Sequence, residues 1–203
     1  MFVLEQNNKI MRKTILSITM VLAMYHLSAQ NPNPIVVISS TKGDIVVELY
    51  PEKAPVTVEN FLKYVDMDLF SPATFYRVVT MKNQPQNKVK IEVVQGGLWY
   101  TDTLLMLESI THETTEVTGI KHEHGTFSMA RNEPGSATSE FFICVNDQPS
   151  LDHGGLRNPD EQGFSAFGKV IRGMDIVEII HQSPNMNQML APPIEIKSIK
   201  RLD

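Results

Sequence analysis

The chain has a single cysteine, Cys144, among its 203 residues. One thiol excludes an intramolecular disulfide, and the apolar run at residues 141–145 predicts that this side chain is buried and unreactive. The chain also lacks an excess of positive charge, because 18 Lys and Arg stand against 23 Asp and Glu. A net charge of −5 gives no sign of a general nucleic-acid-binding surface, which would normally be basic.

The apolar run near the N-terminus, residues 14–25, is too short for a comfortable membrane span. Arg12 and Lys13 precede it, and the small residues Ser28 and Ala29 follow it. Basic residues, a short apolar run and small residues after that run are typical of a secretory signal peptide. An uncleaved membrane anchor is the alternative interpretation.

We therefore predict three parts in the chain. Residues 1–30 form an N-terminal extension and a signal peptide, which would conventionally begin at Met11, residues 31–34 form a short linker, and residues 35–203 form one globular domain. The hydrophobic content of 42% suffices for a single core at this length. The protein is expected to be exported, either periplasmic or secreted, with no membrane attachment after signal cleavage.

Short strands dominate the rest of the sequence. Residues 35–38 and 45–50 are rich in Ile and Val, and they flank residues 41–44, where Gly43 favours a hairpin turn. Residues 194–199 alternate apolar and polar side chains, which predicts the last strand.

Two segments have helical periodicity instead. The first begins at Ala54 and Pro55, since proline is favoured in the first turn of a helix. Its apolar residues recur at helical spacing: Val58, Phe61, Leu62 and Val65. The second spans residues 174–180, with one face expected to carry Ile176, Ile179 and Ile180. Many strands and two helices predict a mainly β fold, a closed and mostly antiparallel barrel.

Six segments of the chain occur in the order that the cyclophilin family shows, and together they resemble that family. They are residues 54–61, 75–79, 95–97, 125–131, 139–143 and 167–170. The similar region runs from about residue 35 to the C-terminus. The resemblance implies an eight-stranded antiparallel barrel capped by two α-helices. It also implies peptidyl-prolyl cis/trans isomerase activity on proline-containing segments of other proteins.

This activity needs little chemical machinery. Rotation about a peptide C–N bond faces a barrier of roughly 18–20 kcal/mol, because resonance gives the bond partial double-bond character. No bond forms or breaks, so no nucleophile, metal or cofactor is needed. A donor that favours a pyramidal prolyl nitrogen in the twisted state, beside a dry pocket for the ring, lowers the barrier.

Arg77 is the candidate donor, because its planar and permanently charged fork can direct an N–H at the prolyl nitrogen more rigidly than a lysine. By the resemblance, Gln95 binds the substrate carbonyl, and the backbone of Ala130 and Arg131 holds the extended peptide. The resemblance also implies a set of residues that form or border the proline pocket: Val93, Met129, Phe142, Leu151 and Phe164. The alternatives are a surface ion pair for Arg77 and plain core packing for Phe142.

Two segments depart from the family pattern. Arg77 and Gln95 lie eighteen residues apart, further than in the family. Residues 81–90 fill this interval, and we expect them to form a hairpin extension beside the site. Residues 98–106 replace a glycine-rich loop with bulkier, partly apolar side chains, which would cover the groove or offer a surface to a partner.

Glu92 distinguishes two functions from different classes. It stands where the family usually has phenylalanine, unless the alignment slips by one residue and places Ile91 there. A carboxylate inside the pocket would spoil its apolar character and could pair with Arg77, which favours a catalytically weak binding module or chaperone. Glu92 outside the pocket favours an isomerase that accelerates X-Pro isomerisation during the folding of exported proteins.

His122 and His124 are two residues apart, so their imidazoles share a face only in a strand. No nearby His or Cys completes a tetrahedral metal site. We expect a solvated turn here, no metal or cofactor in the protein, and a monomer.

Overall fold

The computed structural model describes residues 33–202. The predicted extension and signal peptide, residues 1–30, lie outside the described residues. Within the described part, no helix combines the length and the apolar character that a membrane crossing requires.

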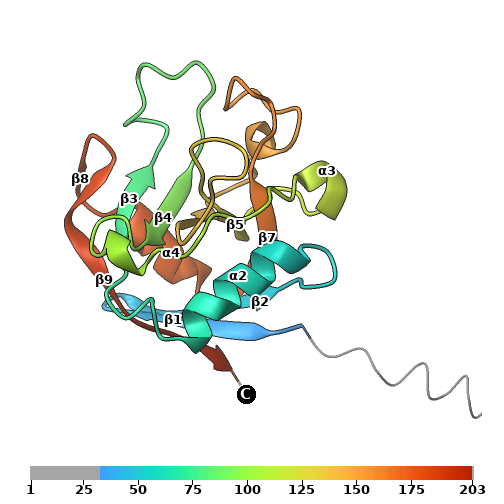
Figure 1. Cartoon of the computed structure of the whole chain (residues 1–203). Helices are drawn as coiled ribbons and strands as arrows, with labels where there is room; N and C mark the ends of the chain where they lie inside the picture. The colour runs from blue at the N-terminus through green and yellow to red at the C-terminus, as the bar shows by residue number, and fades with distance from the viewer. Residues whose placement is uncertain (1–32, 203) are drawn as a thin grey trace, which may run out of the picture. The chain divides into compact units, whose positions relative to one another are not determined.

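Eight of the strands described between residues 33 and 202 close into an antiparallel barrel (Figure 1). They are β1 (Ile35–Ser40), β2 (Gly43–Leu49), β3 (Thr74–Val79), β4 (Val93–Gly97), β5 (Thr126–Met129), β6 (Phe141–Cys144), β7 (Ser165–Arg172) and β9 (Met189–Leu202). Their order is β1-β2-β7-β5-β6-β4-β3-β9, and pairing of β1 with β9 closes the barrel. The short β8 (Asn185–Met186) pairs with β9 alone. The predicted fold class is confirmed.

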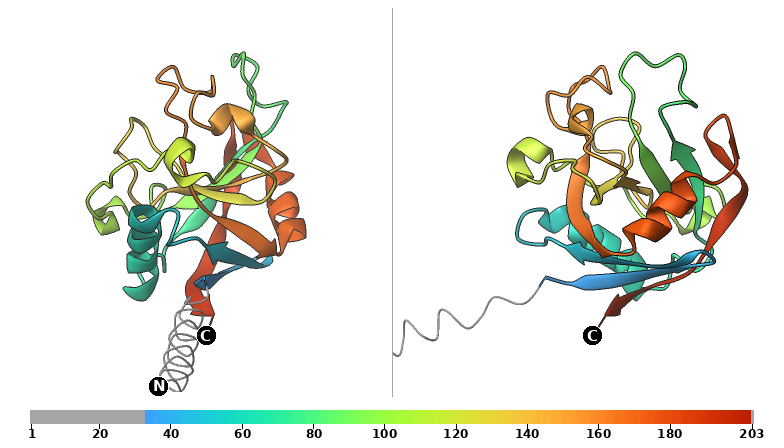
Figure 2. Two further views of the ribbon diagram at one scale, coloured as in Figure 1. Left: turned by 90° about the vertical axis from the view of Figure 1, so that its right-hand side faces the viewer. Right: turned by 180° about the vertical axis from the view of Figure 1, so that it is seen from behind.

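The two predicted helices are α2 (Pro55–Asp66) and α4 (Met174–His181), and they lie on opposite sides of the barrel (Figures 1 and 2). The described residues add the single turn α3 (Thr115–Thr118) and two 3-10 turns, η1 (Thr103–Leu105) and η2 (Pro149–Leu151). The predicted inner face of α4 was partly wrong. Val177 and Ile180, three positions apart, are buried, whereas Ile179 is 50% exposed because it projects from the opposite side of the helix.

Phenylalanine side chains fill the barrel interior. The ring of Phe61, from α2, lies 5.2–5.9 Å from four other rings: Phe70, Phe127, Phe141 and Phe167. Aromatic contacts at these distances add to the free energy gained by burial. Side chains alternate along a strand, so the neighbour of each inward phenylalanine points to the outer face of the barrel.

A second apolar cluster therefore forms on that outer face. Its buried members are Val79, Ile91, Val93, Phe142, Cys144 and Leu151, with Ala130 and Phe164 packed against them. Cys144 is fully buried, as predicted, and its burial raises the pKa of the thiol well above the ordinary value. This cluster supplies the apolar surface on which the candidate site is built.

Candidate active site

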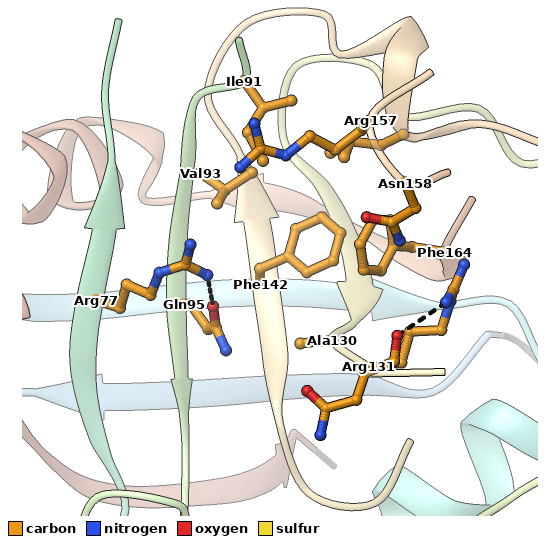
Figure 3. A pocket seen from close by; sticks show the side chains of 12 residues that line it. Arg77, Ile91, Val93, Gln95, Ala130, Arg131, Phe142, Arg157, Asn158 and Phe164 are labelled. Atoms are coloured by element: carbon orange, nitrogen blue, oxygen red, sulfur yellow. Dashed lines mark hydrogen bonds between the residues drawn. The ribbon is translucent and has the colours of Figure 1, made fainter. Parts of the chain in front are cut away.

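A cavity of about 230 Å³ lies over the second apolar cluster (Figure 3). Its lining comes from β3, β4, β6 and the segments that follow β5 and precede β7: Arg77, Ile91, Val93, Gln95, Ala130, Arg131, Asn132, Phe142, Leu151, Arg157, Asn158 and Phe164. Eight of the nine predicted site residues therefore meet at one place. They are Arg77, Val93, Gln95, Ala130, Arg131, Phe142, Leu151 and Phe164.

Met129 is the exception. Its side chain is 1% exposed and packs in the barrel interior with the main core. Along β5, Phe127 and Met129 point inward, so Ser128 and then Ala130 point outward. Contrary to the expectation, Met129 does not border the pocket, and Ala130 is the residue of this strand end that reaches it.

Hydrogen bonds to two glutamines fix the Arg77 guanidinium at the rim of the cavity. Nη1 donates to Gln95 Oε1 at 2.7 Å, while Nε and Nη2 donate to Gln188 Oε1 at 3.0 and 2.6 Å. No Asp or Glu among the described residues forms an ion pair with Arg77. The alternative of a surface ion pair therefore does not hold. Burial lowers the pKa of this guanidinium, with a smaller contribution from nearby Arg157, and an arginine remains charged at neutral pH.

A chain of hydrogen bonds orients the Gln95 amide. Its Oε1 accepts from Arg77, and its Nε2 donates to the Tyr76 hydroxyl oxygen at 2.7 Å. The Tyr76 hydroxyl in turn donates to Glu140. Burial, and then the charge of Glu140, raise the pKa of Tyr76, so that the phenol keeps its proton. The second proton of Gln95 Nε2 remains for a substrate carbonyl.

Glu140 also explains the glycine at the end of β4. Its Oε1 accepts from the backbone N–H groups of Leu98 and Trp99 at 2.8 and 2.9 Å. A Cβ on Gly97 would lie 2.5 Å from the same oxygen, and the Gly97 φ of +143° also disfavours a side chain. The carboxylate therefore links the start of the 98–106 segment to Tyr76 of β3.

Glu92 lies outside the cavity lining. Its Oε2 accepts from Asn146 Nδ2 at 3.1 Å, while Ile91 and Val93 on either side of it line the cavity (Figure 3). Of the two residues considered for the phenylalanine position, Ile91 lines the cavity and Glu92 does not. The pocket keeps its apolar wall, which favours the isomerase over the weak binding module.

Residues 81–90 form an irregular loop rather than the expected hairpin extension. Gln84, which is 2% exposed, holds the base of the loop. Its Nε2 donates to the carbonyl oxygens of Thr80 and Ile91 at 2.8 and 2.6 Å. The side chain thus replaces the backbone pairing that a longer hairpin would have supplied.

Two residues of the 98–106 segment, Trp99 and Met106, line a second cavity. This cavity of about 510 Å³ adjoins the first, and its lining also includes Tyr76. Both cavities share five residues: Arg77, Gln95, Ala130, Arg131 and Asn132. An extended peptide can therefore run from one cavity to the other past Arg77.

His122 is buried rather than part of a solvated turn, which corrects the expectation. Its Nδ1 lies 2.8 Å from Asp152 Oδ1 and its Nε2 lies 2.9 Å from Ser128 Oγ. An ionised carboxylate only accepts, so Nδ1 carries the proton and Nε2 accepts from the serine. The ring stacks 5.9 Å from that of Phe142 and thus supports the cavity wall. No group of three or more His, Cys, Asp and Glu suited to a metal occurs in the part of the chain described.

Acid is expected to destabilise the fold through His122 and Asp152. Burial lowers the pKa of His122, so below the ordinary value near 6.5 the unfolded chain binds a proton that the folded protein does not. Burial raises the pKa of Asp152, but the hydrogen bonds from His122 outweigh it and the net pKa is lowered. The stabilisation of the fold by ionised Asp152 is therefore lost only at still lower pH, where this carboxylate is protonated. Denaturant melts should show the free energy of unfolding fall by up to about 1.4 kcal/mol per pH unit below pH 6.5.

His122→Asn should reduce that slope between pH 6.5 and 5. Equal slopes for the wild type and His122→Asn would show that another group causes the loss.

Gln188 is the site residue that sequence reasoning missed most completely. It lies 111 residues from Arg77, in the turn between β8 and β9, with a left-handed φ of 73°. We expect Gln188→Ala to lower kcat/KM about three- to tenfold, because Arg77 loses two of its three hydrogen bonds and becomes less fixed. Met186→Ala, at an exposed side chain of the same hairpin, is the control. An NMR exchange assay in which both variants match the wild type would contradict this role.

Fold and site together define a closed β-barrel that can hold an extended peptide beside a fixed guanidinium. The chain belongs to the cyclophilin family, since the family model described as cyclophilin type peptidyl-prolyl cis-trans isomerase/CLD matches residues 35–201. Peptidyl-prolyl cis-trans isomerase A of Dickeya dadantii is 33% identical over 92% of this chain and 93% of that protein. A peptidyl-prolyl cis-trans isomerase of Acinetobacter baylyi is 32% identical over 83% and 85% of the two chains.

A solved structure gives the same fold. The crystal structure of a cyclophilin type peptidyl-prolyl cis-trans isomerase of Cryptosporidium parvum superimposes with a TM-score of 0.67 at 21% identity. It covers 84% of this chain and 98% of that one. By family and fold, the enzyme class of the chain is peptidyl-prolyl cis-trans isomerase.

Proposed function

We propose that the protein accelerates X-Pro isomerisation in exported proteins as they fold, with Arg77 as the donor to the prolyl nitrogen. The main observation in favour of catalysis is the 2.7 Å hydrogen bond from Arg77 to Gln95 at the rim of a cavity with an apolar floor. This bond holds the guanidinium at the edge of an apolar floor formed by Val93, Phe142 and Phe164.

The proline ring would sit against Phe142 and Phe164, whose rings meet edge to face at 5.3 Å. A planar prolyl nitrogen shares its lone pair with the carbonyl and accepts no hydrogen bond. In the twisted state the lone pair is localised, so an N–H of Arg77 binds it there and not in either planar isomer. An interaction confined to the transition state raises kcat. Gln95 would hold the neighbouring carbonyl while the bond rotates.

Two observations support a proline-containing peptide as the substrate. The cavity of about 230 Å³ has room for such a ring against its apolar floor. A second structure of the Cryptosporidium parvum protein was solved in the presence of the dipeptide Ala-Pro, with a TM-score of 0.66. The corresponding ligand for this chain is an X-Pro segment of another protein.

Export is supported by the sequence alone, through the basic, apolar and small residues between positions 12 and 29. The full chain, expressed in a Gram-negative host, should appear in the periplasm with its N-terminal signal segment removed. Arg12→Glu with Lys13→Glu should accumulate in the cytoplasm as the uncleaved chain, whereas charge reversal at the exposed Lys197 and Lys200 should not. Unprocessed wild-type protein in the cytoplasm would refute export.

A further inference from the structure

Two arginines with no acidic partner line the same cavity. Arg77 and Arg157 both contribute to its wall. Among residues 33–202, neither guanidinium lies within ion-pair distance of an Asp or Glu. The cavity is thus locally positive although the whole chain carries a net charge of −5.

The loop at residues 81–90 holds Arg157 in place. Its Nη1 donates to Gln84 Oε1 at 3.2 Å and to the Val89 carbonyl at 2.7 Å. Figure 3 shows the guanidinium beside Ile91 and Val93. Its Nε and Nη2 make no hydrogen bond to the described residues. Arg157 therefore has donors left for a ligand.

Arg131 lines the same cavity but differs in this respect. Its terminal nitrogens donate to both carboxylate oxygens of Asp160 at 2.8 and 2.9 Å, and its Nε donates to the Gly163 carbonyl at 2.8 Å. Its charge is thus neutralised within the protein. The unpaired positive charge of the cavity comes from Arg77 and Arg157.

The proposed function implies a direction for a peptide that spans the two cavities. Both cavities are lined by Arg77 and Gln95, so the X-Pro bond would lie at their boundary, with the ring over Phe142. Residues before the proline would then extend towards Trp99 in the second cavity. The residue after the proline would leave by the opposite end of the first cavity, which Arg157 lines.

We propose that Arg157 determines specificity by selecting substrates with an acidic side chain directly after the proline. This inference rests on the proposed function. A carboxylate there would accept charge-assisted hydrogen bonds from a guanidinium that is already positioned. A lysine at the same place would meet two unneutralised positive charges.

The test compares peptides Ala-Ala-Pro-Y-Ala in which Y is Glu, Gln or Lys, by NMR exchange spectroscopy. At low salt, kcat/KM should be about fivefold higher for Glu than for Gln, and lower again for Lys. The differences should shrink in 0.5 M NaCl, because salt screens partly exposed charges. Chemical-shift titrations should rank the three affinities in the same order.

Three variants test whether Arg157 causes the preference for Glu after the proline. Arg157→Gln should reduce the Glu-to-Gln ratio to about one, Arg157→Lys should keep part of it, and Arg172→Gln, which removes a charge at an exposed position of β7, should keep all of it. Equal values for the three peptides, a ratio that survives Arg157→Gln, or a preference only for an acidic residue before the proline would overturn the proposal. If the three peptides bind in the expected order of affinity but none is isomerised faster than without protein, the proposed catalysis is refuted and the proposed specificity stands.

Discussion

Arg77→Ala is expected to lower kcat/KM for an Ala-Pro peptide by roughly ten- to a thousandfold, about 1.4 to 4 kcal/mol in the transition state. In the proposed mechanism the guanidinium is the donor to the prolyl nitrogen, and alanine would leave no donor in its place. The loss should fall mainly on kcat, because the interaction forms only when the bond is twisted. A protease-coupled assay with matched uncatalysed rates measures it.

The barrel should survive this substitution, because Arg77 lies on the outer face and contributes nothing to the phenylalanine core. Unchanged circular dichroism and melting temperature would show this. Arg77→Lys keeps the charge but loses the planar fork that donates to both Gln95 and Gln188. Its rate should therefore lie between those of the wild type and Arg77→Ala. Wild-type rates for Arg77→Ala in a folded protein would remove Arg77 from its role.

Phe142→Ala is expected to cost both activity and stability. The ring forms the floor of the cavity between Val93 and Phe164 and packs on His122. Its removal should lower kcat/KM roughly ten- to a hundredfold through weaker binding of the proline ring, which raises KM. Loss of a buried phenylalanine should also lower the free energy of unfolding by roughly 3–5 kcal/mol.

A second variant separates the two effects. Ile38→Ala removes a fully buried side chain from β1, which lies outside the cavity lining. It should destabilise the protein by roughly 2–5 kcal/mol with little change in kcat/KM at a temperature where the protein stays folded. If Ile38→Ala lowered kcat/KM as much as Phe142→Ala, the effect of Phe142 would reflect general loosening and not a proline pocket.

The elements that could be predicted are those whose cause lies within a short stretch of sequence. Proline at position 55 with apolar residues at helical spacing specified α2, and the Ile- and Val-rich runs around residues 41–44 specified the β1–β2 hairpin. The ordered family motifs placed Arg77, Gln95 and Phe142 at one site. The structure brings these three together around one cavity.

The misplaced residues have their causes elsewhere in the chain. Met129 points into the barrel interior because the phase of β5 depends on its pairing with β6 and β7. The local sequence predicts a solvated position for His122, yet Asp152 and Ser128 form hydrogen bonds with both of its ring nitrogens inside the protein. Neither pairing leaves a signal in the local sequence.

The amino-acid sequence by itself determined the barrel class and the two capping helices, because periodicity and turn chemistry act over a few neighbouring residues. The resemblance to a family, carried by the ordered motifs, placed Arg77 and Gln95 at one site. Only the tertiary structure decided that Gln188 fixes Arg77, that Glu92 turns away, and that Arg157 enters the cavity. These contacts join segments up to 111 residues apart, and they form only once the closed barrel has set the distances between its loops.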